Sequence, residues 1–235
     1  MLHEKTVEAG TLALIKKLSS DKVLNNFVLV GGTALALQLG HRKSIDIDLF
    51  TPRAFDAESL ARRLETVYRA QLVGVLGNTV TSEIDDVRTM LMAHQYPWVK
   101  PPQTIDGIRI ASLEDIGAMK FNAIINSGTR IKDYIDVYAL LQQRNLGQLM
   151  DAYTKKYQGS SPVIAKNALL YHKEIDFGTD VKMMGGPLKW PEVVKRLKEA
   201  LREPRKVFQN KDVSANERKD QGEDVSKGLR RGRAR

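Results

Sequence analysis

The chain has 235 residues, of which 42% are hydrophobic, and a formal net charge of +9 at pH 7. This length and composition are ordinary for a soluble globular protein with one large domain or two small ones. The longest apolar runs, such as 27–30, are far shorter than the roughly 20 residues of a membrane-spanning helix. The first ten residues include acids and no apolar signal-peptide core. We therefore expect a cytoplasmic protein with no membrane partner.

Cysteine is absent, which excludes disulfides and thiolate metal sites. The four histidines do not have the spacing of zinc ligands. Any metal site must therefore consist mainly of carboxylate oxygen, which suits magnesium or manganese. Much of the positive charge lies in the last nine residues, KGLRRGRAR, which hold five basic residues and no acid. We interpret this segment as the end of a solvated, disordered tail rather than as an RNA-binding arm.

The predicted elements of the first part of the chain alternate between helix and strand. Apolar residues recur at helical spacing over 7–20, and a short β-rich run follows at 26–30. The run 33–39 contains strong helix formers and ends at Gly40, which suits a helix C-cap. A β-rich run at 44–50 and then a further helical pattern complete the order strand, helix, strand, helix.

Strand patterns dominate from Gln71 onward. The β-rich runs lie at 71–77, 79–84, 87–93 and 104–110. Asp85 and Asp86 separate the second run from the third and favour a two-residue hairpin turn. Tyr96, Pro97 and Trp98 follow in an irregular segment, and we expect them to pack against the helical region rather than to stack on a base.

The pattern becomes helical from Ser112. This serine, followed by Glu114 and Asp115, predicts a capped helix start, and further helical patterns extend to about residue 202. The predicted fold class is therefore α/β (α+β), with a mixed sheet, flanking helices and a helical C-terminal region. We predict an α/β core at 1–110, a helical region at 111–202 that completes the cleft, and a charged tail at 203–235. Residue 111 marks either a domain junction or the far side of one compact unit.

The stretch SIDIDLF contains two aspartates in what otherwise resembles a buried strand. Side chains alternate along a strand, so Asp46 and Asp48 should share one face while Ile45, Ile47 and Leu49 share the other. Their carboxylates would lie about 6 to 7 Å apart along the strand. Like charges at that separation raise each other's pKa unless a cation lies between them. The pair is therefore a predicted site for a divalent metal, completed by substrate phosphates.

Gly31 and Gly32 lie at the predicted change from strand to helix. A Gly-Gly turn lets backbone N–H groups approach an anion closely, and the helix adds the positive end of its dipole. Thr33 could donate its hydroxyl to a phosphate or cap the helix. Either motif alone is weak, because a Gly-Gly turn is often only a turn, but together they predict a nucleoside triphosphate site. Arg42 and Lys43 could bind phosphate or the RNA backbone. Alternatively, they belong to a solvated loop.

The run VGGTALALQLGHRKSIDIDLF resembles the signature of the nucleotidyltransferase fold of polymerase-β-like enzymes. More narrowly, it resembles the AbiEii/AbiGii nucleotidyltransferase toxins of bacterial abortive-infection, type IV toxin–antitoxin systems. The stretches GIRIASLEDIGAMKFNAI, KDYIDVYALL and YHKEID, and later KWPEVVKRL, resemble the same family in the same order. The resemblance covers about residues 10–200 and implies a nucleotidyltransferase-like mixed sheet.

The resemblance implies transfer of a nucleotidyl group from a nucleoside triphosphate, with magnesium or manganese, to a hydroxyl of an RNA such as tRNA. It also implies an antitoxin partner and a role in phage defence. Gly31, Gly32 and Thr33 would hold the triphosphate, while Asp46 and Asp48 would bind metal.

By the same resemblance, Lys120 would stabilise the negative charge of the phosphates. Asp133 or Asp136 would be the functional carboxylate of the last motif, KDYID. The alternatives are a solvent-facing Lys120 and a surface ion pair between Lys132 and Asp136.

The family's pattern has a third carboxylate on a later strand, and this chain departs from it. The corresponding strand has Thr89, Met90 and Leu91 and no acid, and the preceding turn residues Asp85 and Asp86 are out of register. The acceptor hydroxyl would then depend on Asp133 or Asp136 for activation, or the protein would be a catalytically silent module that binds a nucleotide or a partner. A small-molecule (antibiotic) nucleotidyltransferase is a further alternative, since it differs only in the acceptor.

Overall fold

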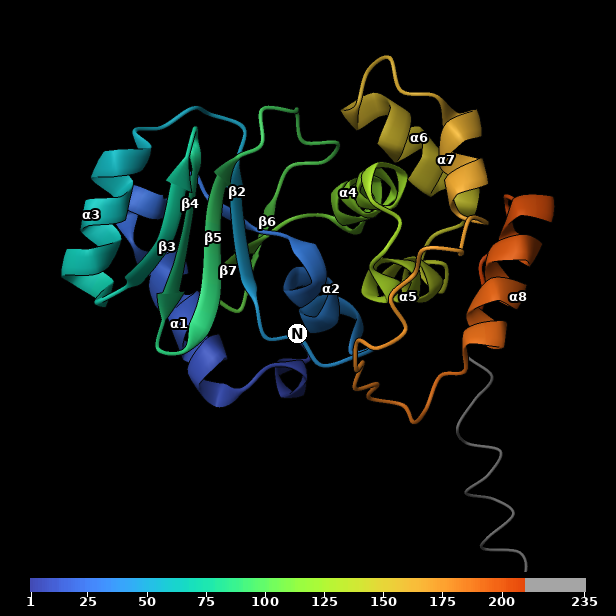
Figure 1. The fold of residues 1–235 in the computed structure, drawn as a ribbon, viewed down its shortest axis with the longest axis horizontal. Helices are drawn as coiled ribbons and strands as arrows, with labels where there is room; N and C mark the ends of the chain where they lie inside the picture. The colour runs from blue at the N-terminus through green and yellow to red at the C-terminus, as the bar shows by residue number, and fades with distance from the viewer. Residues whose placement is uncertain (210–235) are drawn as a thin grey trace, which may run out of the picture.

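The computed structural model describes residues 1–209. Residues 210–235, most of the tail predicted at 203–235, lie outside the described residues. A mixed sheet of seven strands lies at one end of the molecule with α1 and α3, and helices α4 to α8 gather at the other (Figure 1). Helix α2 lies between the two groups. The strands are β1 (Val28–Leu29), β2 (Ile47–Thr51), β3 (Gln71–Leu76), β4 (Thr79–Ile84), β5 (Val87–Ala93), β6 (Gln103–Ile105) and β7 (Ile108–Ile110). The helices are α1 (Ala9–Ser20), α2 (Gly31–Leu39), α3 (Ala57–Tyr68), α4 (Leu113–Asn126), α5 (Ile131–Leu140), α6 (Leu146–Lys156), α7 (Pro162–Ala168) and α8 (Trp190–Arg202).

The strands follow the order β3-β4-β5-β2-β1-β7-β6 across the sheet. β2 is central: it runs antiparallel to β1 and parallel to β5. The register of the parallel pair sets Asp48 of β2 beside Met90 of β5. The mixed α/β class that the sequence predicts is thereby confirmed, and no helix within residues 1–209 is long and apolar enough to cross a membrane.

Local signals in the sequence account for several element ends. Gly40 has φ +68° and ends α2 in the left-handed conformation, as a C-cap glycine does. The Ser112 hydroxyl accepts a hydrogen bond from the Asp115 N–H at the start of α4. Asp85 and Asp86 both have positive φ, at 49° and 61°, and form the two-residue turn between β4 and β5.

Two boundaries differ from the expectation. Helix α2 begins at Gly31 rather than Thr33, so both glycines belong to its first turn. Strand β2 begins at Ile47, and Ile45, which the alternation had assigned to the buried face, is 63% exposed. The strand pattern fails there because Ile45 precedes the first sheet pairing, and alternation is fixed only where a strand is paired.

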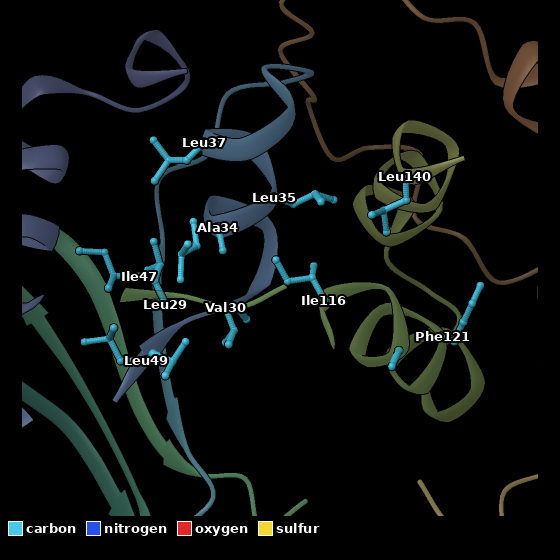
Figure 2. Packing of buried hydrophobic residues seen from close by; sticks show 14 of the residues in the cluster. Leu29, Val30, Ala34, Leu35, Leu37, Ile47, Leu49, Ile116, Phe121 and Leu140 are labelled. Atoms are coloured by element: carbon cyan, nitrogen blue, oxygen red, sulfur yellow. The ribbon is translucent and has the colours of Figure 1, made fainter. Parts of the chain in front are cut away.

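One continuous hydrophobic core joins the sheet to the helices, and α2 lies at its centre (Figure 2). Strands β1 and β2 present apolar side chains to one side of α2, and α4 and α5 present theirs to the other. The labelled members are Leu29, Val30, Ala34, Leu35, Leu37, Ile47, Leu49, Ile116, Phe121 and Leu140. The sheet and the helical region therefore share α2 between them, while the division at residue 110 stays a prediction.

A buried ion pair attaches the segment after β5 to the helices. Lys156 of α6 and Asp115 of α4 are fully buried, with 2.9 Å between Lys156 Nζ and the carboxylate. Lys156 Nζ also lies 4.7 Å from the centre of the Trp98 ring, and the Tyr96 ring lies 4.7 Å from that of Tyr157. These contacts agree with the expectation that the Tyr-Pro-Trp run packs against the helical region.

Candidate active site

A cavity of about 700 Å³ opens where α2, β2, β5, α4 and α5 meet the segment between α7 and α8. We call residues 169–189, which have no regular secondary structure, the connecting segment. Nearly half of the lining residues are charged, and basic residues outnumber acids. The charged lining residues are Arg42, Lys43, Asp46, Asp48, Arg88, Lys120, Arg130, Lys132, Asp133, Asp180 and Lys182.

Asp46 and Asp48 face this cavity from the start of β2. Burial raises the pKa of the Asp48 carboxyl, and the negative charge of Asp46 raises it further, against the opposing effect of Lys120. Neither carboxylate has an ion-pair partner within residues 1–209. Two half-buried carboxylates that line one cavity, with no protein cation bound to them, have donor atoms that could hold a divalent ion.

The two glycines at the start of α2 allow charged groups to lie directly against the backbone. A Cβ on Gly31 would lie 2.3 Å from Asp48 Oδ2, and a Cβ on Gly32 would lie 2.3 Å from Arg42 Nη2. Gly31 also has φ +70°, which favours glycine. The first N–H groups of α2 therefore open onto the carboxylate pair, where the helix dipole favours an anion.

Thr33 uses its hydroxyl within the protein rather than on a ligand. The side chain is buried; its hydroxyl donates to the backbone carbonyl of Asp46 and lies 2.9 Å from the Ser44 hydroxyl. Thr33 thereby ties the first turn of α2 to the backbone that carries Asp46. Only its backbone N–H remains as a donor for a phosphate.

A buried charge network lies beneath the cavity and centres on Asp136. Its carboxylate accepts hydrogen bonds from Arg42 Nε (2.7 Å) and Arg42 Nη2 (2.9 Å), and Lys120 Nζ lies 2.7 Å from its Oδ2. His41 Nε2 lies 2.9 Å from Oδ1. Lys120 Nζ also donates to Asp133 Oδ1 at 2.7 Å. The loop after α2, helix α4 and helix α5 therefore meet in one set of paired charges.

The pKa directions agree with these contacts. Burial alone would raise the pKa of Asp136, but Lys120 and Arg42 outweigh it and hold that pKa well below its usual range. Burial would lower the pKa of Lys120, but Asp136 and Asp133 raise it overall. Burial lowers the pKa of His41, so its ring is neutral at pH 7. The network thus pairs two basic side chains, Arg42 and Lys120, with the carboxylates of Asp133 and Asp136.

The structure brings every predicted site residue except Asp136 to the cavity lining: Gly31, Gly32, Thr33, Arg42, Lys43, Asp46, Asp48, Lys120 and Asp133. Asp136 lies beneath them, fully buried. The two alternatives for the helical residues do not hold. Lys120 is buried rather than solvent-facing, and Asp136 pairs with Arg42 and Lys120 rather than with Lys132 at the surface.

The β5 strand has no acid at the cavity, as the sequence indicates. Met90 pairs with Asp48 in the sheet, and Arg88, two residues earlier on the same face, also lines the cavity. Asp85 and Asp86 lie in the hairpin turn and are not among the lining residues. Period-two alternation along residues 87–93 sets Arg88 and Met90 on one face of the strand. The sequence therefore contained a signal that both could line the cavity. Asp180 and Lys182 carry no such signal, because their segment has no periodicity.

The matches to known proteins agree with this geometry. Residues 13–106 match the family described as the nucleotidyl transferase AbiEii toxin of a type IV toxin–antitoxin system. A protein of Aquifex aeolicus (strain VF5), itself uncharacterized, is 31% identical over 166 residues, which are 68% of this chain and 80% of that protein.

Two solved structures share the fold. MenT4, a nucleotidyltransferase toxin from Mycobacterium tuberculosis H37Rv, has a TM-score of 0.55 at 15% identity over 81% of this chain and 80% of its own. A protein from H. pylori, described as a candidate nucleotidyltransferase, has a TM-score of 0.54 at 19% identity over 86% of this chain and 93% of its own. By the family match of residues 13–106 and a relative of 31% identity over two thirds of the chain, the chain belongs to the AbiEii family of nucleotidyl transferase toxins.

Proposed function

We propose that the protein transfers a nucleotidyl group from a nucleoside triphosphate to a hydroxyl of an RNA acceptor such as tRNA. In this proposal it acts as the toxin of a type IV toxin–antitoxin system with a cognate antitoxin. The observation that carries the proposal is the contact between Asp48 and the start of α2. Asp48 lies directly against Gly31. A carboxylate suited to a metal ion and N–H groups suited to phosphate therefore lie beside each other at the cavity.

In this proposal the triphosphate binds at the first turn of α2. The backbone N–H groups of Gly31, Gly32 and Thr33 would bind its terminal phosphates, with the helix dipole adding to the attraction. Lys43 and Arg130 line the same cavity and are partly exposed. The ion-pair partner of Lys43 is the exposed Glu8, so Lys43 can approach a phosphate without leaving a buried partner. The excess of cations over acids in the lining favours a ligand as anionic as a triphosphate.

Asp46 and Asp48 fit a magnesium or manganese ion by the chemistry of their donors. Both are carboxylates without a protein cation, and burial raises the pKa of Asp48. Residues 1–209 contain no group of three or more His, Cys, Asp or Glu side chains suited to a metal, so phosphate oxygens would complete the ligand set. When bound, such an ion neutralises charge that develops on the reacting phosphoryl group.

Lys120 supplies fixed positive charge at the wall of the cavity. Asp133 and Asp136 hold its ammonium group in place at 2.7 Å each, so it needs no rearrangement as negative charge develops on the substrate. Asp136 acts through Lys120 and Arg42 and is a positioning residue in this scheme. Arg42 in turn lies against Gly32 and links the network to the start of α2.

The test is a transfer assay with purified protein, magnesium, each labelled nucleoside triphosphate in turn, and total tRNA. We expect label on RNA with the wild type and none with Asp46→Asn/Asp48→Asn. Asp151→Asn removes an exposed carboxylate on α6, away from the cavity, and serves as the matched control with full activity. Label transferred equally well by the double variant would refute the proposal.

A silent binding module is the second candidate, and one observation favours it: β5 presents Arg88 and Met90 to the cavity and no acid. This candidate predicts nucleotide binding that Asp46→Asn/Asp48→Asn weakens, with no label transferred to any RNA. Calorimetric titration of the same proteins with each nucleoside triphosphate separates the two candidates.

A further inference from the structure

We propose that Asp180 of the connecting segment is the general base that accepts the proton of the acceptor hydroxyl. The inference rests on the proposed transferase function and names a catalytic residue that its motifs do not include. Asp180 would supply from a loop the carboxylate that β5 lacks.

Four acids line the cavity: Asp46, Asp48, Asp133 and Asp180. Asp46 and Asp48 are the residues suited to hold the metal. Asp133 is 3% exposed, and its Oδ1 accepts a hydrogen bond from Lys120 at 2.7 Å, so this carboxylate is already engaged within the protein. Asp180 remains. It is exposed to solvent and has no ion-pair partner within the described part of the chain.

The backbone on both sides of Asp180 is held in place. On one side, the Asp176 N–H donates to the Thr129 carbonyl at 2.8 Å. On the other, the Lys43 N–H donates to the Lys182 carbonyl at 2.8 Å. Figure 1 shows the connecting segment as the yellow-to-orange trace that runs from α7 to α8 past α5. Main-chain hydrogen bonds to the loop before α5 and to the loop before β2 therefore hold the backbone on either side of Asp180 at the rim of the cavity.

The Asp176 side chain shapes the backbone just before Asp180. Its carboxylate accepts hydrogen bonds from the Gly178 N–H and the Thr179 hydroxyl, both at 2.8 Å. This local turn limits the conformations available to the next residue. A base must be within reach of the acceptor hydroxyl to act, and the turn orders the backbone from which the Asp180 side chain extends.

A role as a base suits Asp180 better than a role as a third metal ligand. Within residues 1–209, no set of three carboxylates or imidazoles is close enough to share a metal, so Asp180 is not part of the Asp46–Asp48 pair. In the reaction, the acceptor O–H proton passes to the Asp180 carboxylate. The acceptor oxygen forms a bond to the α-phosphorus, and the bond from that phosphorus to the bridging oxygen breaks. Pyrophosphate leaves with the electron pair.

The experiment measures transfer to total tRNA by the full-length wild type, Asp180→Asn, Asp180→Glu and the control Glu174→Gln. Glu174 is an exposed acid on the same segment and is not among the cavity residues. We expect Asp180→Asn to lower kcat by about 100-fold, the lower end of general-base effects. KM for the triphosphate and the melting temperature should stay unchanged. Asp180→Glu should regain part of kcat, and Glu174→Gln should behave as the wild type.

The outcomes separate the inference from the function on which it rests. If Asp180→Asn keeps kcat within about threefold of the wild type while Asp46→Asn/Asp48→Asn is inactive, the base assignment is wrong and the transferase stands. A rise in KM without a fall in kcat would likewise overturn it and make Asp180 a binding residue. If the wild type transfers no label, the function and the inference fail together.

Discussion

Gly31 and Asp48 occupy adjoining space: a Cβ on Gly31 would lie 2.3 Å from Asp48 Oδ2. The carboxylate therefore lies directly against the backbone at the start of α2. The same holds for Gly32 and Arg42 Nη2, also at 2.3 Å. The Gly-Gly pair is thus a steric requirement for two charged side chains, in addition to a turn between strand and helix.

Gly31→Ala should displace Asp48 and abolish binding of magnesium-loaded triphosphate. It should also cost about 1 to 2 kcal/mol of folding free energy, because φ +70° is unfavourable for alanine. Calorimetric titration and urea unfolding measure the two effects. Gly10→Ala in α1 is the control, since its Cβ would meet no heavy atom within 4 Å. It should bind normally and gain up to about 1 kcal/mol. Normal binding by Gly31→Ala would contradict the steric account.

Asp48→Asn should raise thermal stability at pH 7 while it abolishes transfer. The folded pKa of Asp48 is raised, so its ionisation opposes folding once the pH exceeds the ordinary value of 3.8. The stabilisation by Asp48→Asn should accordingly disappear in more acidic buffer. Magnesium should raise the melting temperature of the wild type but not that of Asp46→Asn/Asp48→Asn. Scanning calorimetry with and without magnesium checks both points, and an equal magnesium effect in the double variant would argue against the carboxylate pair as the metal site.

Asp136→Asn should be strongly destabilising, by about 3 to 5 kcal/mol, because it leaves Arg42 and Lys120 buried with too little negative charge. The pKa of Asp136 is lowered, so its contribution is complete above the ordinary carboxyl value and is lost only as the pH falls through the lower folded value. Urea unfolding at pH 7 and at acidic pH measures the difference in unfolding free energy between wild type and variant. This difference should narrow only in strong acid. A gap that closed near pH 6 would contradict this assignment.

Lys156→Met should cost about 3 kcal/mol of stability and leave transfer per folded molecule unchanged. Lys156 Nζ bonds Asp115 at 2.9 Å and the Pro97 carbonyl at 3.1 Å, in a cluster that is not part of the cavity. The exposed neighbour Lys155 gives the matched control, Lys155→Met, which should be nearly neutral. Denaturant unfolding and the RNA assay together test this, and a loss of activity without a loss of stability would be the contrary result.

The sequence predicts the local features that depend on near neighbours. Period-two alternation correctly sets Asp46 and Asp48 opposite Ile47 and Leu49, and the caps at Gly40 and Ser112 are where their chemistry indicates. Such signals act within a few residues, so a single sequence contains them. Ile45 shows the limit, because its exposure depends on where pairing in the sheet begins.

The partners of the buried charges could not be predicted in the same way. Arg42 and Asp136 are separated by 94 positions, and nothing near either residue indicates the other. Lys120 was open to a solvent-facing interpretation for the same reason. Asp180 lies in a segment without periodicity, and main-chain hydrogen bonds with distant residues help to hold that segment at the cavity. Long-range packing, rather than local propensity, completes the site.

The Asp136 network also sets an order of events during synthesis. A nascent chain that has emerged as far as Ile110 contains Gly31, Asp46 and Asp48, but its Arg42 still lacks the anion that holds it. The cavity is complete only after α5 and the connecting segment have left the ribosome. Under the proposed function, a product of translation that stops before α5 would lack a complete site and would transfer no nucleotide.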